Sequence, residues 1–233
     1  MTDAAAVAAV ACLLGDRSRA AMCLAMLDGG AWTVSELADA ASVGRAAASE
    51  HVGRLVSGGL VTTETQGRHK FVRLAGPQVG ELLELLSGFG TAAPPRSLDA
   101  VRERRRMAVA RTCYDHLAGR LGVAVHDALV GRHLLTHRDG LRLTPRGRDW
   151  FADLGVDVEG LERQRRVLLR ECVDLTERTP HLAGSLGAAL CDRFVAEDWV
   201  RRRHHSRTLE VTPLGERAVA DLLGLVPADL AVG

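Results

Sequence analysis

The first 90 residues repeat a helical pattern of apolar and polar positions. An apolar run over residues 4–14 predicts one helix, and a second helical pattern covers residues 18–27. A side chain able to cap a helix, Thr33 or Ser35, precedes a short third helix, and residues 45–57 have the period of a fourth. Because the third and fourth patterns lie only a few residues apart, they predict a tight helix-turn-helix unit.

Extended patterns follow this unit. Residues 60–64 and 69–74 are short runs of strand-forming residues, and the polar stretch 66–68 between them contains a glycine. This arrangement predicts an antiparallel hairpin with a basic tip. Residues 78–89 return to a helical pattern with a broad apolar surface, part of which we expect to meet a second chain.

A break in these patterns divides the chain. Two adjacent prolines, Pro94 and Pro95, disfavour helix for the residues before them, so residues 91–97 predict an extended linker. We therefore expect a first domain over residues 1–90 and a second over residues 98–233.

The second domain contains a duplication. Residues 116–156 resemble residues 181–226, with three extra residues in the middle of the second copy. Each copy begins with H-L-A-G-x-L-G, continues as a helical pattern, and reaches a short hairpin that ends in Thr-Pro, where the threonine caps a last helix. The repeats span residues 113–156 and 178–226, approximately. The predicted fold class is mainly α with small antiparallel β-wings: a winged helix-turn-helix followed by a C-terminal domain of two winged-helix-like repeats.

The overall charge gives no reason to expect nucleic acid or a membrane as a partner. The chain has 233 residues, of which 47% are hydrophobic and 25% charged, and a formal net charge of +1. Residues 4–14 are too short to span a bilayer and lack a basic start, so we expect no membrane partner. The five cysteines are widely spaced and form no Cys-x-x-Cys pair, which is typical of reduced thiols. We therefore predict a cytoplasmic protein.

Two segments of the first domain, LLGDRSRAAMCLAML and TVSELADAASVGRAAASEHVGRLVSGGLVTTETQGRHKFVRL, resemble the ArsR family of bacterial winged-helix transcription factors. In that family a serine and a histidine of the recognition helix precede a leucine and a Gly-Leu-Val strand start. Here Ser49, His51, Leu55 and Gly59-Leu60-Val61 occupy those places. The resemblance covers residues 10–90, approximately. It implies a homodimer formed through the first and closing helices, which binds double-stranded operator DNA with half-sites about one turn apart and represses a nearby operon.

Local charge agrees with this resemblance, although the total charge of the domain does not. Residues 1–90 contain seven Lys and Arg against nine Asp and Glu, a net charge of −2. The presumed recognition helix and wing nevertheless collect basic residues, and attraction to phosphates is local. Small residues at the helix start allow it to approach a major groove. The predicted DNA contacts are Arg45, Ala46, Ala47, Ser49, Glu50, His51, Arg54, Arg68, His69 and Lys70.

The positions at which many ArsR-like repressors bind a sensed metal carry no suitable set of ligands here. Residues 33–39, before the recognition helix, contain no cysteine. The closing helix has Glu81 and Glu84 but no histidine, and two carboxylates alone suit a borderline metal poorly. We therefore expect effector sensing in the second domain.

Both copies of H-L-A-G-x-L-G place two glycines in a predicted helix at matching positions. An interior glycine costs roughly 1 kcal/mol relative to alanine, so a repeated cost indicates a compensating gain. That gain is either a close crossing of the two equivalent helices or a slot for a small ligand between them. The candidate effector pocket is formed by Cys113, His116, Gly119, Gly122, His181, Gly184 and Gly187.

A metal is the other candidate effector. Cys113 and His116 are three residues apart, on one face of the predicted helix, and we expect them to converge with His181. Either Cys191 or Cys172 supplies a further ligand in this hypothesis, and such a set suits zinc or another borderline metal. The sequence leaves a metal and a small-molecule effector equally open.

Two other functions compete with a regulator. A protein-interaction adaptor would use winged-helix folds without binding DNA. An enzyme would use Cys113, Asp115 and His116 as its nucleophile and base, but neighbours along one helix cannot easily form such a chain of contacts. We expect a homodimeric repressor, not an enzyme, whose C-terminal domain senses a small molecule or a metal.

Overall fold

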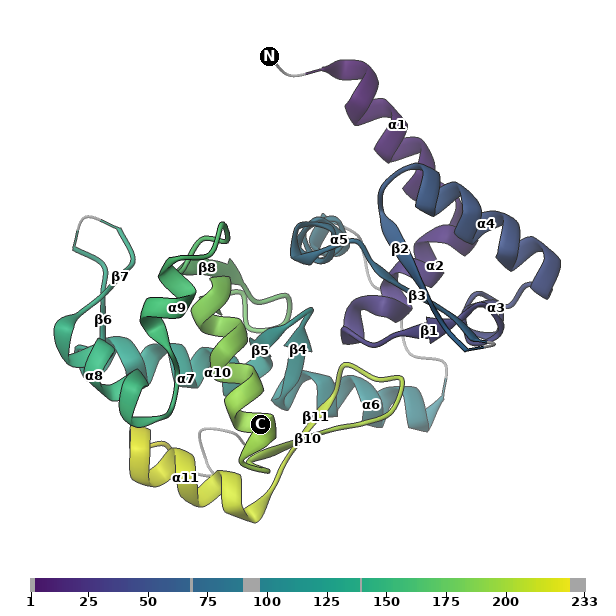
Figure 1. The fold of residues 1–233 in the computed structure, drawn as a ribbon. Coiled ribbons are helices and arrows are strands. Elements are labelled where there is room, and N and C mark those ends of the chain that lie inside the picture. Colours follow the sequence, from purple (N-terminus) through teal and green to yellow (C-terminus); the bar gives the residue numbers. More distant parts are fainter. Residues whose placement is uncertain (1–2, 68, 90–96, 139, 227–233) are drawn as a thin grey trace. The chain divides into compact units, whose positions relative to one another are not determined.

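The computed structural model describes residues 3–67, 69–89, 97–138 and 140–226, and the chain divides into two compact units, Met1–Gly90 and Thr91–Gly233 (Figure 1). We call them the N-terminal unit and the C-terminal unit. Of the predicted linker only Ser97 is described, and its hydroxyl oxygen accepts a hydrogen bond from the N–H of Ala100 at 3.1 Å. None of the described helices combines the length and the apolar character that crossing a bilayer requires.

The N-terminal unit is a winged helix-turn-helix. In chain order its elements are α1 (Ala4–Leu14), α2 (Arg17–Ala25), a 3₁₀ turn (Met26–Asp28), β1 (Trp32–Thr33), α3 (Val34–Ala41), α4 (Arg45–Ser57), β2 (Val61–Gln66), β3 (His69–Leu74) and α5 (Pro77–Phe89). The strands form one antiparallel sheet in the order β1-β3-β2. The recognition helix and the wing are therefore α4 and the β2–β3 hairpin.

Local signals set the helix boundaries of this unit. The carboxylate of Asp16 caps α2, and Thr33 forms a reciprocal capping box with Glu36 at the start of α3. Ser42 ends α3 in the left-handed region, with φ 54°, which turns the chain into α4. The core beneath these elements contains Met22, Met26, Leu27, Leu37, Val52 and Leu55.

Each repeat of the C-terminal unit consists of a hairpin, a helix, a second hairpin and a last helix. The first repeat is β4 (Arg111–Cys113), β5 (His116–Ala118), α7 (Gly119–Gly131), β6 (Leu135–Thr136), β7 (Arg142–Leu143) and α8 (Pro145–Asp153). The second is β8 (Arg170–Val173), β9 (Pro180–Ala183), α10 (Gly184–Ala196), β10 (Val200–Arg202), β11 (Leu209–Val211) and α11 (Pro213–Leu223). Helix α6 (Leu98–Val109) precedes the first repeat, and α9 (Val158–Glu162) precedes the second. The predicted fold class, mainly α with small antiparallel wings, is confirmed.

The prediction that H-L-A-G opens a helix in each repeat is wrong. His116 and His181 lie in strands β5 and β9, which pair with β4 and β8. The helices begin only at Gly119 and Gly184, whose φ angles are 72° and 86°. Because residues with a side chain rarely adopt such angles, these two glycines make the turn from strand to helix. Cys113 and His116 are consequently neighbours across a hairpin and not along a helix.

The other two glycines of the motif are required by close backbone contacts. A Cβ atom on Gly122 would lie 2.4 Å from the carbonyl oxygen of Leu117, and one on Gly187 would lie 2.6 Å from that of Leu182. The backbone of each repeat's own hairpin therefore fills the space that a side chain would take. This contact with the hairpin is the gain that accounts for the two glycines, and it is neither a crossing of the two equivalent helices nor a ligand slot between them.

Buried residues of both repeats form one core. Strand β5 packs against α10 of the other repeat, and β9 packs against α7. The shared core includes Leu117, Leu121, Leu129 and Phe151 from the first repeat and Leu182, Leu186, Phe194 and Val219 from the second. The two repeats therefore fold as one body.

Candidate nucleic-acid interface and candidate metal centre

Helix α4 has a buried side and an exposed side. Ala48, Val52 and Leu55 are buried in the N-terminal unit. The exposed residues include six of the predicted DNA contacts, Arg45, Ala46, Ala47, Ser49, Glu50 and Arg54. Gly44 precedes the helix without a side-chain cap, so backbone N–H groups of the first turn are accessible beside small side chains. This surface has the shape and polarity that a major-groove contact requires.

Three of the predicted contacts, Glu50, Arg54 and His51, lie close to another charged side chain. Glu50 Oε1 accepts a hydrogen bond from Arg54 Nη2 at 2.6 Å on the exposed side. His51 Nδ1 lies 3.9 Å from Asp16 Oδ1, and the His51 side chain is only 19% exposed. His51 is therefore partly buried beside the residue that caps α2, and its role as a DNA contact stays a prediction.

The wing offers two described basic residues. Lys70 is exposed and stands opposite Thr65, and Arg73 is exposed and stands opposite Thr62. Since side chains alternate along a strand, Lys70 and Arg73 point to opposite faces of the hairpin. Arg68 lies outside the described residues, as does the side chain of His69, so these two predicted contacts stay predictions.

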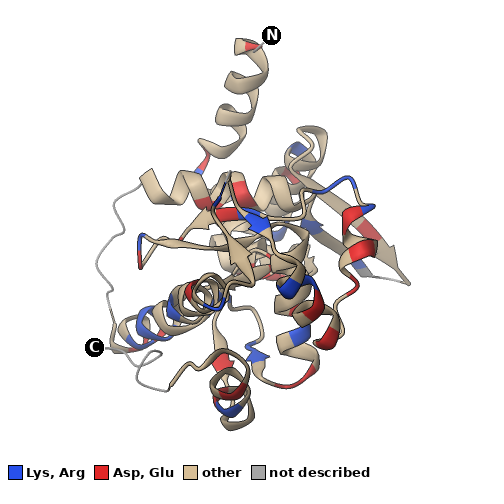
Figure 2. Ribbon diagram, turned by 90° about the vertical axis from the view of Figure 1, so that its left-hand side faces the viewer, with Lys and Arg blue, Asp and Glu red and all other residues tan. Residues whose placement is uncertain are grey.

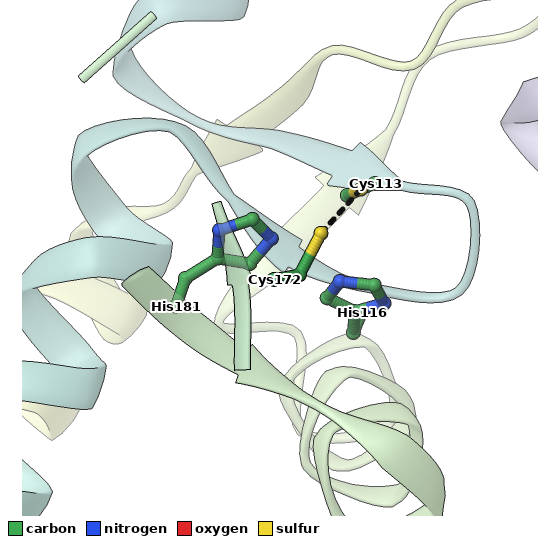
Figure 3. A group of neighbouring side chains, drawn as sticks. All are labelled: Cys113, His116, Cys172 and His181. Atoms are coloured by element: carbon green, nitrogen blue, oxygen red, sulfur yellow. Dashed lines mark hydrogen bonds between the residues drawn. The ribbon is translucent and has the colours of Figure 1, made fainter. Parts of the chain in front are cut away.

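Four metal-ligating side chains converge in the C-terminal unit, as Figure 3 shows. The Sγ atoms of Cys113 and Cys172 lie 3.7 Å apart, and the rings of His116 and His181 stack with their centroids 5.0 Å apart. One ligand atom from each residue lies within 4.8 Å of the others. Cys113, His116 and His181 are buried, and Cys172 is partly exposed. We call this group the Cys/His cluster.

The Cys/His cluster is built from the same element of each repeat. Cys113 stands opposite His116 in the β4–β5 hairpin, and Cys172 stands opposite His181 in the β8–β9 hairpin. A Cβ atom on Gly187 would meet His116 at 3.5 Å, and one on Gly122 would meet His181 at 3.8 Å. Each repeat therefore supplies one thiol and one imidazole, and seats its histidine against the other repeat's helix.

A carboxylate lies beside one ring nitrogen of each histidine. His116 Nδ1 is 3.1 Å from Asp115 Oδ1, and His181 Nδ1 is 3.8 Å from Asp174 Oδ2. Burial lowers the pKa of His116, but the hydrogen bond to Asp115 and the charge of Cys172 raise it, and the net shift is upward. The hydrogen bond at Nδ1 of His116 orients this imidazole with Nε2 directed elsewhere, which is the usual arrangement of a metal-bound histidine.

Two thiols of the C-terminal unit, those of Cys172 and Cys191, differ widely in acidity. Interaction with Cys113 lowers the pKa of Cys172, burial opposes this shift, and His116 and His181 lower it further. Cys172 therefore ionises far more readily than an ordinary thiol. Burial raises the pKa of Cys191 to about 12, so this thiol stays protonated.

These positions correct the predicted ligand set. Cys191 is fully buried among core residues and does not belong to the Cys/His cluster, whereas Cys172 does. A signal for Cys172 exists in the sequence, because Arg-x-Cys precedes the histidine in both repeats, at Arg111 and at Arg170. Two residues separate cysteine from histidine in the first repeat and eight in the second, and this difference hides the correspondence.

Two further features lie elsewhere in the C-terminal unit. His126, His137 and Glu171 form a second group whose ligand atoms lie within 4.8 Å of one another, and two of its members are exposed. A cleft of about 440 Å³ is lined by α9, α10 and the loop before α9, including Asp192 and Arg193. Neither feature involves the glycines that we expected to line an effector pocket.

The exposed helix α4, the wing and the sheet that supports it define a winged helix-turn-helix protein of the DNA-binding class. A family model described as a helix-turn-helix domain matches residues 14–64. The chain is 35% identical over 213 residues to YdfF of Bacillus subtilis, described as an uncharacterized HTH-type transcriptional regulator, and the match covers 91% of this chain and 94% of YdfF. The chain therefore belongs to the family of HTH-type transcriptional regulators. The predicted class, a helix-turn-helix transcriptional regulator, is confirmed.

Solved structures also resemble the N-terminal unit. One is the homodimeric winged helix-turn-helix DNA-binding domain of Mb0332 from Mycobacterium bovis, described as a possible ArsR-family regulator. It is 29% identical, with a TM-score of 0.33, and the match covers 37% of this chain and 84% of that one. Another is the cadmium metal-sensor CMTR from Mycobacterium tuberculosis, which is 26% identical, with a TM-score of 0.30 and coverage of 39% and 98%.

Proposed function

We propose that the protein is a cytoplasmic, homodimeric repressor that binds operator DNA through α4 and the wing, and whose C-terminal unit senses a small molecule or a metal. The exposed start of α4 carries the proposal. Ala46 and Ala47 allow the helix backbone to approach base edges closely, and Arg45 and Ser49 offer hydrogen bonds to bases or phosphates. The net charge of the unit is unfavourable, but phosphate contacts depend on charges within about a Debye length.

Two apolar helices support a dimer. Helix α1 contains no buried residue, and Figure 2 shows it, next to the label N, with hardly any charged residue. On α5, Leu85 is 61% exposed and Phe89 is 88% exposed. Exposed apolar surface of this kind marks a protein interface, and a second copy of the same chain is the partner that a two-fold operator requires.

The test is fluorescence anisotropy of a labelled duplex from the gene's own upstream region, with an unrelated duplex as the competitor. We expect selective binding that weakens with salt, because phosphate contacts release counterions. Arg45→Ala should weaken binding about tenfold, in line with the loss of one base or phosphate contact. Arg217→Ala, which removes an exposed arginine of α11, is the matched control and should leave the affinity unchanged.

Two results would refute the proposal. Absence of selective binding at low salt, with and without added metal ions, would favour an adaptor that uses its winged helix for protein contacts. An equal loss of affinity in Arg45→Ala and Arg217→Ala would show that general charge, and not α4, binds the DNA.

A further inference from the structure

The geometry of the Cys/His cluster matches a tetrahedral metal site. Two sulfur atoms bound to one zinc ion at about 2.3 Å, with a tetrahedral angle between them, are about 3.8 Å apart. The Sγ atoms of Cys113 and Cys172 are 3.7 Å apart. Two thiolates and two imidazoles form one of the common ligand sets of tetrahedral zinc.

The polar atoms of the histidines supply a second, independent observation. Within the described part of the chain, His116 Nε2 and both ring nitrogens of His181 are buried and make no hydrogen bond. Buried polar atoms without a partner cost free energy, and native proteins normally satisfy them. A cation between the two imidazoles and the two thiolates would satisfy His116 Nε2 and His181 Nε2 together.

The site does not have to be filled for the unit to fold. The hairpins that carry the ligands are held by the core that both repeats share, and by the buried ion pair between Arg111 and Asp174. The ligands are therefore positioned before an ion arrives, unlike those of a zinc finger, whose fold forms only with its metal. Partly exposed Cys172, next to exposed Val173, gives an ion a route from the solvent.

We propose that Cys113, His116, Cys172 and His181 bind one divalent cation of the zinc class per chain, and that its binding changes the affinity of the protein for DNA. The change in DNA affinity rests on the proposed repressor function. It takes a metal ion, and not a small molecule, as the effector of that repressor. The ion would clamp the β4–β5 hairpin of one repeat to the β8–β9 hairpin of the other. Asp115 acts as a positioning residue for His116.

The first experiment measures the metal alone. Reduced, metal-free full-length protein is titrated with Co²⁺ and then with Zn²⁺, and visible absorption reports a tetrahedral cobalt–thiolate centre. We expect one equivalent per chain, with zinc displacing cobalt. Cys113→Ser and Cys172→Ser should each weaken binding more than about 100-fold, since the loss of a group that only hydrogen-bonds a metal ligand already costs about 10–100-fold.

Matched controls separate the cluster from other thiols and histidines. Cys12→Ser removes an exposed cysteine of the other unit, and His137→Gln disrupts the second histidine group. Both variants should bind one cobalt ion as the wild type does. Circular dichroism in the presence of a chelator verifies that each variant is folded. If a cysteine variant does not fold, His116→Gln is used in its place.

Several outcomes would overturn the metal site. Absence of a stoichiometric complex, retention of the cobalt spectrum in Cys113→Ser and Cys172→Ser, or its loss in His137→Gln would each do so. A reduced protein that binds no ion but forms a Cys113–Cys172 disulfide on mild oxidation would identify a redox pair instead.

The second experiment compares DNA affinity in Zn²⁺ and in chelator by the anisotropy assay. We expect at least a tenfold change for the wild type and His137→Gln, and less than a twofold change for Cys113→Ser/Cys172→Ser. Stoichiometric metal binding without a change in DNA affinity would refute the regulatory part and make the ion structural. Absence of DNA binding in both conditions would refute the repressor function while leaving the metal site established.

Discussion

The ion pair between Arg111 and Asp174 joins the two repeats and is almost completely shielded from water. Arg111 Nη2 lies 2.9 Å from Asp174 Oδ2, and the side chains are 3% and 0% exposed. The carboxylate also accepts hydrogen bonds from the N–H of Gly119 at 2.7 Å and of Thr176 at 2.8 Å. Asp174→Asn keeps the size of the side chain but removes its charge, which leaves the guanidinium buried without a counter-ion.

We expect Asp174→Asn to be strongly destabilising. Removing one partner of a buried ion pair costs about 3–5 kcal/mol. With a urea dependence of roughly 2 kcal/mol per M, the unfolding midpoint should fall by about 2 M. The assay is urea unfolding of the full-length protein in chelator, followed by circular dichroism.

An exposed ion pair of the same unit provides the control. Arg148 Nη2 and Glu162 Oε1 are 2.6 Å apart, but their side chains are 42% and 40% exposed. Glu162→Gln should cost less than about 1 kcal/mol, because water screens the pair in both states. Equal midpoint shifts in Asp174→Asn and Glu162→Gln would refute the argument from burial.

Low pH tests the same ion pair in another way. Burial raises the pKa of Asp174, but the charge of Arg111 and the N–H groups of Glu177 and Gly119 lower it more, to well below its ordinary value. A carboxyl with a lowered pKa stabilises the fold fully above its unfolded pKa of about 3.9, and this stabilisation is lost progressively as the pH falls from there through the lower pKa of the folded state. The stability difference between the wild type and Asp174→Asn should therefore shrink below about pH 4. A difference that stays constant from pH 7 to pH 3 would contradict this assignment.

Three further predictions concern packing, thiol reactivity and assembly. Gly215→Ala should lower stability by about 2 kcal/mol or more in thermal unfolding, because the new Cβ would lie 2.0 Å from a backbone carbonyl oxygen. Gly131→Ala, which meets nothing within 4 Å, should change it by less than about 1 kcal/mol. Alkylation of metal-free protein at neutral pH, read by peptide mass spectrometry, should modify Cys172 well before fully buried Cys191, and equal rates would contradict the acidities given above. Leu85→Glu should shift the protein toward monomer in sedimentation, whereas an unchanged dimer would exclude this face of α5 from the interface.

Local chemistry made the N-terminal unit predictable. The bounds of α4 follow from the apolar period of residues 45–57 and from the turn before it, and the structure places them at the same residues. The capping box at Thr33 is likewise predictable, because it joins Thr33 to Glu36, which is close to it in the sequence. The partial burial of His51 depends on Asp16, which is distant in sequence, and the period of α4 alone does not reveal that contact.

The hairpins of the Cys/His cluster were not predicted because their turns lack the usual signals. The β4–β5 turn contains Tyr114 with a φ of 59°, a conformation that normally indicates Gly or Asn. A contact with the distant segment before β11 supports it, since the N–H of Thr112 donates to the carbonyl oxygen of Arg207 at 2.8 Å. Residue types therefore predicted three of the four members of the cluster and left the fourth open between Cys172 and Cys191. That choice, and the backbone conformation of the members, depended on tertiary structure.

The duplication places both ligand pairs of the Cys/His cluster in a single polypeptide. A site shared between two subunits exists only while the subunits are associated, so dilution of the protein empties it. Here the second thiol–imidazole pair is always present at a high effective concentration, however few copies of the chain there are. In a cell that holds only a few copies of the regulator, the free ion concentration, and not the amount of protein, would decide how many of these sites are filled.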